Sequence, residues 1–136
     1  YQIYESKVYK ADSILLIMSI LEDNEIKEYI KIANDIGLDC IIETHTLDEI
    51  DRALKINYPI IGINNRNLDN LSVNINNTLD MIDKIPKSFT VIGESGIKSN
   101  ENIKRYNDNG VYNFLIGETI LKSSNYNLII KKLLSK

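Results

Sequence analysis

Five short apolar stretches recur along the chain, and longer segments of mixed polarity separate them. They are rich in Ile, Leu and Val and cover residues 13–18, 39–42, 60–63, 90–92 and 113–116. Nearly continuous apolar runs of this length are typical of parallel strands that are covered on both faces. The pattern therefore predicts five parallel strands.

The segments between these stretches repeat apolar residues at helical spacing, as amphipathic helices do. Residues 1–10 and 125–134 are interpreted as the first and last helices, and residues 75–85 as a helix that ends before a proline. The predicted helix ends are marked by Gly37 as a C-terminal cap, a capping box of Thr46 and Glu49, Pro86, and Ser99 as an N-terminal cap.

A helix followed by five strand–helix units implies parallel strands joined by right-handed crossovers. An open doubly wound sheet and a (β/α)8 barrel both fit this order. No Gly-x-Gly-x-x-Gly follows the first strand, which counts against a dinucleotide-binding sheet. A complete barrel takes about 250 residues. We therefore expect an α/β fold in which residues 1–136 form the C-terminal part of a single TIM (β/α)8 barrel domain, units 4–8 with the preceding helix, and the N-terminal units are absent.

Composition narrows the possible partners. The 136 residues carry a net charge of −3, which argues against a nucleic-acid partner. No stretch approaches the ~18 apolar residues of a membrane span, and no signal peptide is recognisable, so we expect a cytoplasmic protein without a membrane partner. Cys40 is the only cysteine and lies in an apolar run, so a buried, inert thiol is favoured over a nucleophile.

Polar side chains gather after the carboxyl ends of the predicted strands, whereas the returns into the strands are ordinary turn sequences. The polar groups are Glu43-Thr44-His45, Asn64-Asn65-Arg66, Glu94-Ser95-Gly96 and Gly117-Glu118-Thr119. Barrel enzymes place their active sites at this end of the strands. The asymmetry therefore predicts a functional rim.

The last two predicted strands are followed by Ser95-Gly96 and by Gly117-Glu118. Barrels commonly bind phosphate in these loops, against a short extra helix, because glycine lets backbone N–H groups approach the anion. Glu118 would contribute its backbone N–H, with its carboxylate pointing away from the phosphate. Alternatively, the two glycines merely relieve strain in turns.

The other rim residues allow two interpretations each. Glu43 could have a raised pKa and act as an acid or base, or it could be an exposed residue in an ion pair. Asn64, Asn65 and Arg66 could form a cluster of donors and acceptors in which Arg66 binds a carboxylate, or they could be a loop fixed by asparagine turns with a surface arginine. His45, the single histidine, is interpreted as structural or solvent-facing, and the scattered acids form no recognisable metal site.

Several motifs on this rim resemble those of the indole-3-glycerol phosphate synthase family. Residues 62–68 (GINNRNL) resemble its strand-six signature, residues 94–97 (ESGI) its strand-seven motif and residues 114–118 (FLIGE) its strand eight. Residues 1–5 (YQIYE) resemble the helix after strand three. The resemblance runs nearly end to end, and GINNRNL is its most specific part.

The resemblance implies ring closure of 1-(2-carboxyphenylamino)-1-deoxyribulose 5-phosphate, with loss of carbon dioxide and water and without a metal or cofactor. Glu43 would transfer a proton or steady positive charge at nitrogen, and Asn64 would orient the substrate. Arg66 would face the anthranilate carboxylate, and Glu94 would line the pocket. The implied phosphate-binding residues are Ser95, Gly96, Gly117 and Glu118.

The family's catalytic lysines are absent from this sequence. The resemblance places a general-acid lysine on strand three, before the YQIYE segment, and a second lysine and a glutamate on strand one. Lys7 and Lys10 occupy helix or loop positions and cannot replace them. We therefore expect the chain to need the missing N-terminal half of the barrel as a partner and to be inactive alone.

Two other functions remain open at this stage. Another sugar-phosphate barrel enzyme, such as phosphoribosylanthranilate isomerase, would be expected to use an Asp at the end of strand four, and residues 15–18 offer none there. A half-barrel that binds phosphate without catalysis would pair its open strand edges with another half.

Overall fold

The computed structural model describes residues 1–68 and 70–135. One sheet contains five strands in the order β1-β2-β3-β4-β5, and every neighbouring pair is parallel. The strands are β1 (Ser13–Ile17), β2 (Asp39–Thr44), β3 (Ile60–Asn64), β4 (Thr90–Glu94) and β5 (Asn113–Leu115). All five predicted strands are confirmed, and β2, β3 and β4 extend one or two residues further than the apolar pattern indicated.

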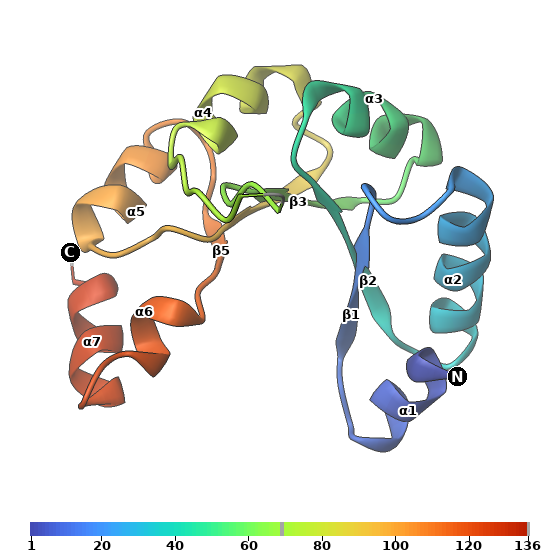
Figure 1. Cartoon of the computed structure of the whole chain (residues 1–136), viewed down its shortest axis with the longest axis horizontal. Helices are drawn as coiled ribbons and strands as arrows, with labels where there is room; N and C mark the ends of the chain where they lie inside the picture. The colour runs from blue at the N-terminus through green and yellow to red at the C-terminus, as the bar shows by residue number, and fades with distance from the viewer. Residues whose placement is uncertain (69, 136) are drawn as a thin grey trace.

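The helices cover the outer face of the sheet. Figure 1 shows the strands as the inner layer of an open arc, with the helices outside and the two termini at opposite ends. The helices are α1 (Gln2–Val8), α2 (Asp23–Asp35), α3 (Leu47–Ile56), α4 (Asn77–Met81), the 3-10 helix η1 (Ile82–Lys84), α5 (Asn100–Asn107), α6 (Glu118–Leu121) and α7 (Tyr126–Leu133).

Two helix predictions need correction. The Thr46 hydroxyl accepts from Glu49 N as predicted, but the Glu49 carboxylate accepts from His45 N at 2.6 Å instead of completing a capping box. The single helix predicted over residues 75–85 is divided into the short α4 and η1. The helix begins at Asn77 instead of Ile75, and the Ile75 carbonyl accepts from the Tyr106 hydroxyl at 2.6 Å.

The register of the strands separates the sheet into two faces. Leu16, Ile42, Ile61 and other apolar side chains point toward the helices and form the buried core. The alternate positions lie on the concave face, where Ile17 is in register with Glu43, Glu43 with Gly62, and Gly62 with Ile92. Polar groups near the carboxyl ends of the strands therefore share the concave face.

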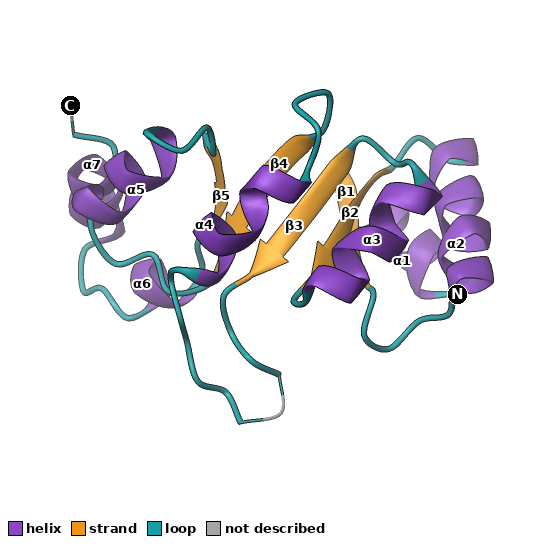
Figure 2. Ribbon diagram, turned by 90° about the horizontal axis from the view of Figure 1, so that it is seen from above, coloured by secondary structure: helices purple, strands orange, loops and turns teal. Residues whose placement is uncertain are grey.

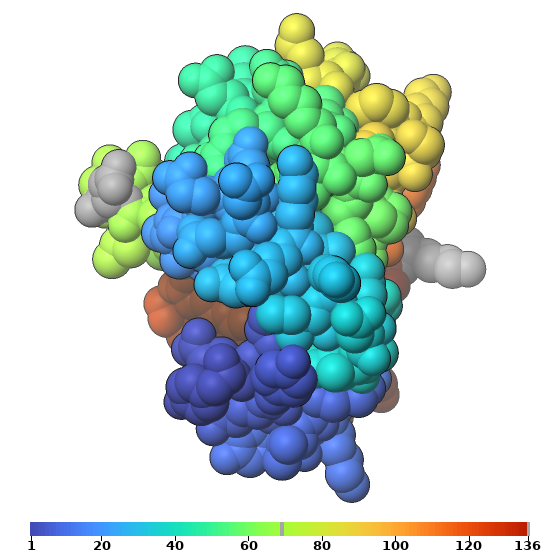
Figure 3. Space-filling view, turned by 90° about the vertical axis from the view of Figure 1, so that its right-hand side faces the viewer, coloured from blue at the N-terminus to red at the C-terminus, as the bar shows by residue number. Residues whose placement is uncertain are grey.

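Each outer strand of the sheet has one edge that pairs with no described strand. Among the described residues, β1 pairs only with β2 and β5 only with β4. Figure 2 shows the strands running in one direction, and Figure 3 looks at the N-terminal end of the arc, where residues coloured blue form the centre and base of the surface. Leu15 is 40% exposed and Leu115 44% exposed. Apolar side chains therefore remain uncovered on both edge strands.

No helix in the described part of the chain is long and apolar enough to cross a membrane.

Candidate functional site

The carboxyl ends of the parallel strands bring the predicted polar residues to one rim. Glu43 is the next-to-last residue of β2, and Asn64 and Glu94 are the last residues of β3 and β4. The extra strand residues explain this placement, since Glu43 and Glu94 are held in the ladder instead of lying in the loops that follow. Their side chains are consequently set by the pleat of the sheet.

Three of these side chains form a buried cluster on the concave face. Glu43 is 5% exposed, Asn64 7% and Glu94 3%. The Asn64 amide donates to Glu43 Oε1 at 3.2 Å, and Asn64 Oδ1 accepts from Arg66 N at 2.9 Å. Asn64 therefore fixes the Glu43 carboxyl and the start of the β3–α4 loop together.

Gly62 makes room for the Glu94 carboxyl. A Cβ atom at residue 62 would lie 2.0 Å from Glu94 Oε1, a separation that is sterically impossible. Gly62 is also in register with Glu43. The missing side chain on β3 therefore lets the Glu94 carboxyl lie over the strand and come next to the carboxyl of Glu43.

Burial and the neighbouring Glu43 carboxyl raise the pKa of Glu94 to about 8. Burial is the larger cause, because removing a carboxylate from water disfavours its charged form. Glu94 Oε1 has no hydrogen-bond partner among the described residues. Glu94 therefore holds its proton near neutral pH beside Glu43, and neither carboxyl forms an ion pair with the described residues.

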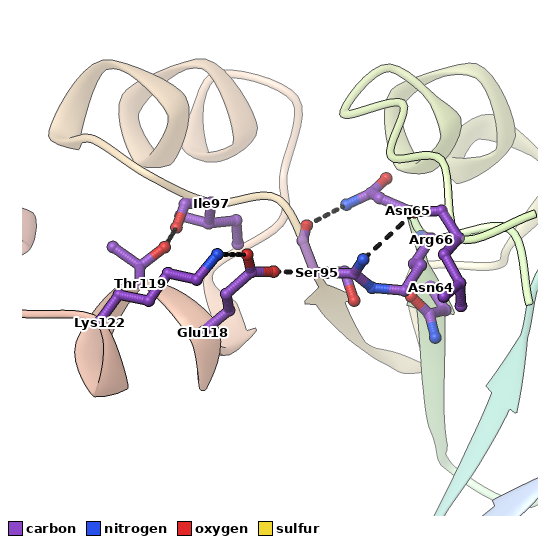
Figure 4. Close-up of polar contacts among 9 residues, drawn as sticks. Asn64, Asn65, Arg66, Ser95, Ile97, Glu118, Thr119 and Lys122 are labelled. Atoms are coloured by element: carbon purple, nitrogen blue, oxygen red, sulfur yellow. Dashed lines mark hydrogen bonds and ion pairs between the residues drawn. The ribbon is translucent and has the colours of Figure 1, made fainter.

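A separate cavity of about 530 Å³ opens beside this pair at the last two strands. It is lined by residues of the β3–α4, β4–α5 and β5–α6 loops and of α6, among them Arg66, Ser95, Gly96, Gly117, Glu118 and Lys122. Figure 4 shows Arg66 reaching across from the end of β3 toward Glu118. All four residues that were predicted to bind phosphate therefore line one cavity, together with the predicted substrate-binding residue Arg66.

The Glu118 carboxylate does not point away from this cavity as the sequence analysis expected. It accepts from Arg66 Nη2 and from Lys122 Nζ, each at 2.5 Å. Lys122 first and then Arg66 hold the pKa of Glu118 below its usual value. The Glu118 carboxylate therefore pairs with two of the three cationic side chains that line the cavity, Arg66 and Lys122, whereas Lys98 is the third.

The two glycines of the cavity have different local roles. Gly96 has φ +78°, and a Cβ there would lie 2.5 Å from Val73 Cγ1, so its turn requires glycine. Gly117 has φ −106°, and a Cβ there would meet no atom within 4 Å. Strain therefore explains Gly96 but not Gly117. Within the described residues, neither N–H group donates to a protein acceptor.

Lys122 is a cavity residue that the sequence had not singled out, although it lies one helical turn after Glu118. Asn65 was singled out, but its partners are distant in sequence and became apparent only in the structure. His45 is structural, as predicted, because its Nδ1 lies 2.8 Å from the Asn64 carbonyl oxygen. Cys40 is fully buried, and burial raises the pKa of its thiol to about 11, so it is inert as predicted.

The arc of parallel strands, with its helices outside and its polar groups on one rim, defines this protein as part of a (β/α)8 barrel. A thiamine phosphate pyrophosphorylase from Pyrococcus furiosus has the same fold, with a TM-score of 0.74 at 14% identity over 96% of this chain and 61% of its own. The chain belongs to the indole-3-glycerol phosphate synthase family, whose sequence model matches residues 1–133.

Relatives with the name indole-3-glycerol phosphate synthase match almost the whole chain. The protein of Lachnoclostridium phytofermentans is 44% identical over 135 residues, which are 99% of this chain and 50% of the relative. That of Clostridium kluyveri is 49% identical over 122 residues, or 90% of this chain and 46% of the relative. The chain thus spans about half the length of the curated relatives it matches.

Proposed function

We propose that this chain supplies the phosphate-binding and carboxyl-bearing half of an indole-3-glycerol phosphate synthase active site. The observation that carries the proposal is that the buried carboxyl cluster and the cavity are linked through Asn64. The Asn64 side chain donates to Glu43 and accepts from the backbone N–H of Arg66, and the Arg66 side chain lines the cavity. A substrate with a phosphate at one end and reacting carbons at the other would span both.

In this proposal the buried cluster handles the reacting end of 1-(2-carboxyphenylamino)-1-deoxyribulose 5-phosphate. Glu43 transfers a proton or steadies the positive charge that develops at nitrogen, and Asn64 orients the substrate. Glu94 lines the pocket beside them. The raised pKa of Glu94, which lies beside Glu43, suits proton transfer near neutral pH, since acids and bases work best when their pKa lies near the operating pH.

The missing half of the barrel supplies the lysines in this proposal. Glu94 Oε1 is buried without a hydrogen-bond partner among the described residues, so a donor such as a lysine ammonium from the other half would satisfy it. The uncovered side chains of Leu15 and Leu115 on the edge strands would be buried by the neighbouring strands of a closed barrel. The preferred partner is therefore the N-terminal half, and the substrate is a sugar phosphate.

The cavity binds the substrate phosphate in this proposal, with Arg66 directed to the phosphate instead of the anthranilate carboxylate that the family resemblance suggested. Arg66 is in the same cavity as Ser95, Gly96 and Gly117, and a guanidinium binds phosphate with two parallel hydrogen bonds. Glu118 contributes its backbone N–H. Every one of these groups comes from this chain, so phosphate binding should not need the missing half.

The phosphate site can be tested with matched glycine variants. Gly117→Ala should leave the free energy of unfolding within about 0.5 kcal/mol of wild type, because a Cβ at residue 117 meets nothing, but it should weaken phosphate binding. Gly96→Ala should lower the free energy of unfolding by about 1 kcal/mol or more. Chemical denaturation and titration of the backbone amide signals with inorganic phosphate measure the two effects. Equal phosphate affinity in Gly117→Ala and wild type would remove the site from the β5–α6 loop.

The charge of Glu118 should oppose phosphate binding. We expect Glu118→Gln to bind inorganic phosphate several-fold more tightly, because it removes a negative charge from the cavity and frees Arg66 and Lys122. Arg66→Ala should bind it more weakly. Asp48→Asn, an exposed position outside the cavity, is the control for net charge. Weaker binding by Glu118→Gln would instead mean that the carboxylate orients Arg66.

A further inference from the structure

Asn65 is a buried hub between the two strand ends that carry the proposed site. Its side chain is 1% exposed. Asn65 Nδ2 lies 2.8 Å from the Glu94 carbonyl oxygen, 3.0 Å from the Ser95 carbonyl oxygen and 2.9 Å from the Tyr106 hydroxyl, so its two N–H groups are shared among three acceptors. Its Oδ1 accepts from N and Oγ1 of Thr78 at 3.1 and 3.0 Å. The carboxamide is therefore fully bonded, and its bonds cross from β3 to three other segments.

The turn that Asn65 contacts has an unfavourable backbone conformation. Ser95 has φ +61° and Gly96 φ +78°, so two successive residues are left-handed. Glycine adopts this conformation readily, whereas a residue with a Cβ resists it. A contact from outside the turn is therefore needed to stabilise Ser95. The Asn65 side chain provides one, because it donates to the carbonyls of Glu94 and Ser95.

The two carbonyls lie on the two sides of Ser95. The Glu94 carbonyl belongs to the peptide plane before Ser95, and the Ser95 carbonyl belongs to the plane after it. A donor group that holds both planes determines φ and ψ of the residue between them. Asn65 thereby also sets the direction of the next N–H group, that of Gly96, which belongs to the second plane and lines the cavity.

Asn65 is itself held by rigid elements. Tyr106 of α5 is 1% exposed, and its hydroxyl accepts from Asn65 and donates to the Ile75 carbonyl. Thr78 of α4 is fully buried and directs Asn65 Oδ1. Figure 4 shows Asn65 beside Ser95, with Arg66 next to it in the chain. A shift of the β4–α5 turn relative to Arg66 would break these contacts.

We propose that Asn65 is a positioning residue, whose carboxamide keeps the Ser95–Gly96 turn left-handed and so presents its backbone N–H groups to the phosphate cavity beside Arg66. The benefit for ligand binding rests on the proposed phosphate site, but the control of the turn does not. Asparagine suits the role because one small group supplies two N–H donors and an acceptor, whereas aspartate supplies acceptors only.

The test compares Asn65→Asp with Tyr106→Phe in the 136-residue chain. Asn65→Asp keeps the shape but loses both donors to the turn. Tyr106→Phe removes a buried hydroxyl from the same network and leaves Asn65 able to bond both carbonyls. Each variant is examined without ligand, by the three-bond HN–Hα coupling of Ser95 and by amide exchange at Gly96. Each is then titrated with inorganic phosphate.

We expect Asn65→Asp to move Ser95 out of the left-handed region and to bind phosphate about tenfold or more weakly, in line with the loss of a buried donor group. Tyr106→Phe should keep the Ser95 coupling and lie within about twofold of wild-type affinity. A Ser95 coupling in Asn65→Asp that is unchanged from wild type overturns the proposal, whatever the phosphate affinity. If Asn65→Asp displaces the turn but the wild-type chain binds no phosphate, the positioning role of Asn65 is supported and the proposed phosphate site is overturned.

Ser95→Gly keeps the proposal testable if Asn65→Asp does not fold. Glycine adopts the left-handed conformation without cost. In a Ser95→Gly background, Asn65→Asp should therefore lower the folding equilibrium constant by a factor about fivefold or more smaller than it does in wild type. The double variant should therefore fold better than Asn65→Asp. A double variant that is no more stable than Asn65→Asp would mean that Asn65 only fills the core.

Discussion

Joined to the N-terminal half of a relative from its family, the chain should form indole-3-glycerol phosphate, whereas alone it should form none. The reason is that the proposed ring closure needs a proton donor at the carbonyl, and the lysines that the family resemblance implies for this role have no counterpart in this sequence. Positioned acid–base groups each contribute about 10²–10⁴-fold. Product formation by the bare chain, measured by indole fluorescence, would refute the argument from the missing lysines.

In the completed enzyme, Glu43→Gln should lower turnover by a similar factor of about 10²–10⁴ while KM changes little. Glutamine keeps the hydrogen bond from Asn64 but cannot exchange a proton or carry a negative charge. Glu28→Gln, on the exposed side of α2, is the matched control and should retain full turnover. A Glu43→Gln enzyme that is impaired only in KM would assign Glu43 to binding.

Glu94 should make the chain less stable as the pH rises from about 4.5 to about 8. Below this window Glu94 is protonated in both the folded and the unfolded chain, so it has no effect. Within the window the unfolded chain releases the proton while the folded chain retains it, and unfolding becomes more favourable. The free energy of unfolding is therefore highest, as far as Glu94 is concerned, below about pH 4.5, and it falls as the pH rises toward the folded-state pKa of about 8.

Glu94→Gln isolates this effect because glutamine has the same shape and does not titrate. The variant should match wild type near pH 4 and exceed its free energy of unfolding by several kcal/mol near pH 8. Urea denaturation at a series of pH values gives the two curves. Parallel curves would show that Glu94 ionises normally. Addition of the N-terminal half should reduce the difference, because a cation beside Glu94 lowers its pKa.

Much of the fold follows from short-range features of the sequence. Parallel strands buried on both faces need continuous apolar runs, so residues 39–42 and 60–63 identified β2 and β3 directly. Side-chain caps act over three or four residues, and Ser99 was predicted as the cap of α5 for that reason. Residues 62–68 were specific enough to indicate the family that the comparisons then showed.

Predictions that used only local pattern were wrong where a distant group competes for the backbone. The helix expected to begin at Ile75 begins at Asn77, and the Ile75 carbonyl accepts from the distant Tyr106 hydroxyl instead. The Glu118 carboxylate was expected to avoid the cavity, since only its charge was considered. Its reach to Arg66, which is 52 residues away in sequence, became apparent only in the folded chain.

The sequence by itself determined which residues stand at the carboxyl ends of the strands, because strand direction and alternation are local properties of the chain. Only the tertiary structure decided which of those residues meet. Glu94 lies over Gly62 and beside Glu43, and Asn65 bonds Tyr106 at a separation of 41 residues. These contacts depend on the register between strands and on the space that one side chain leaves for another, which no single segment of the sequence specifies.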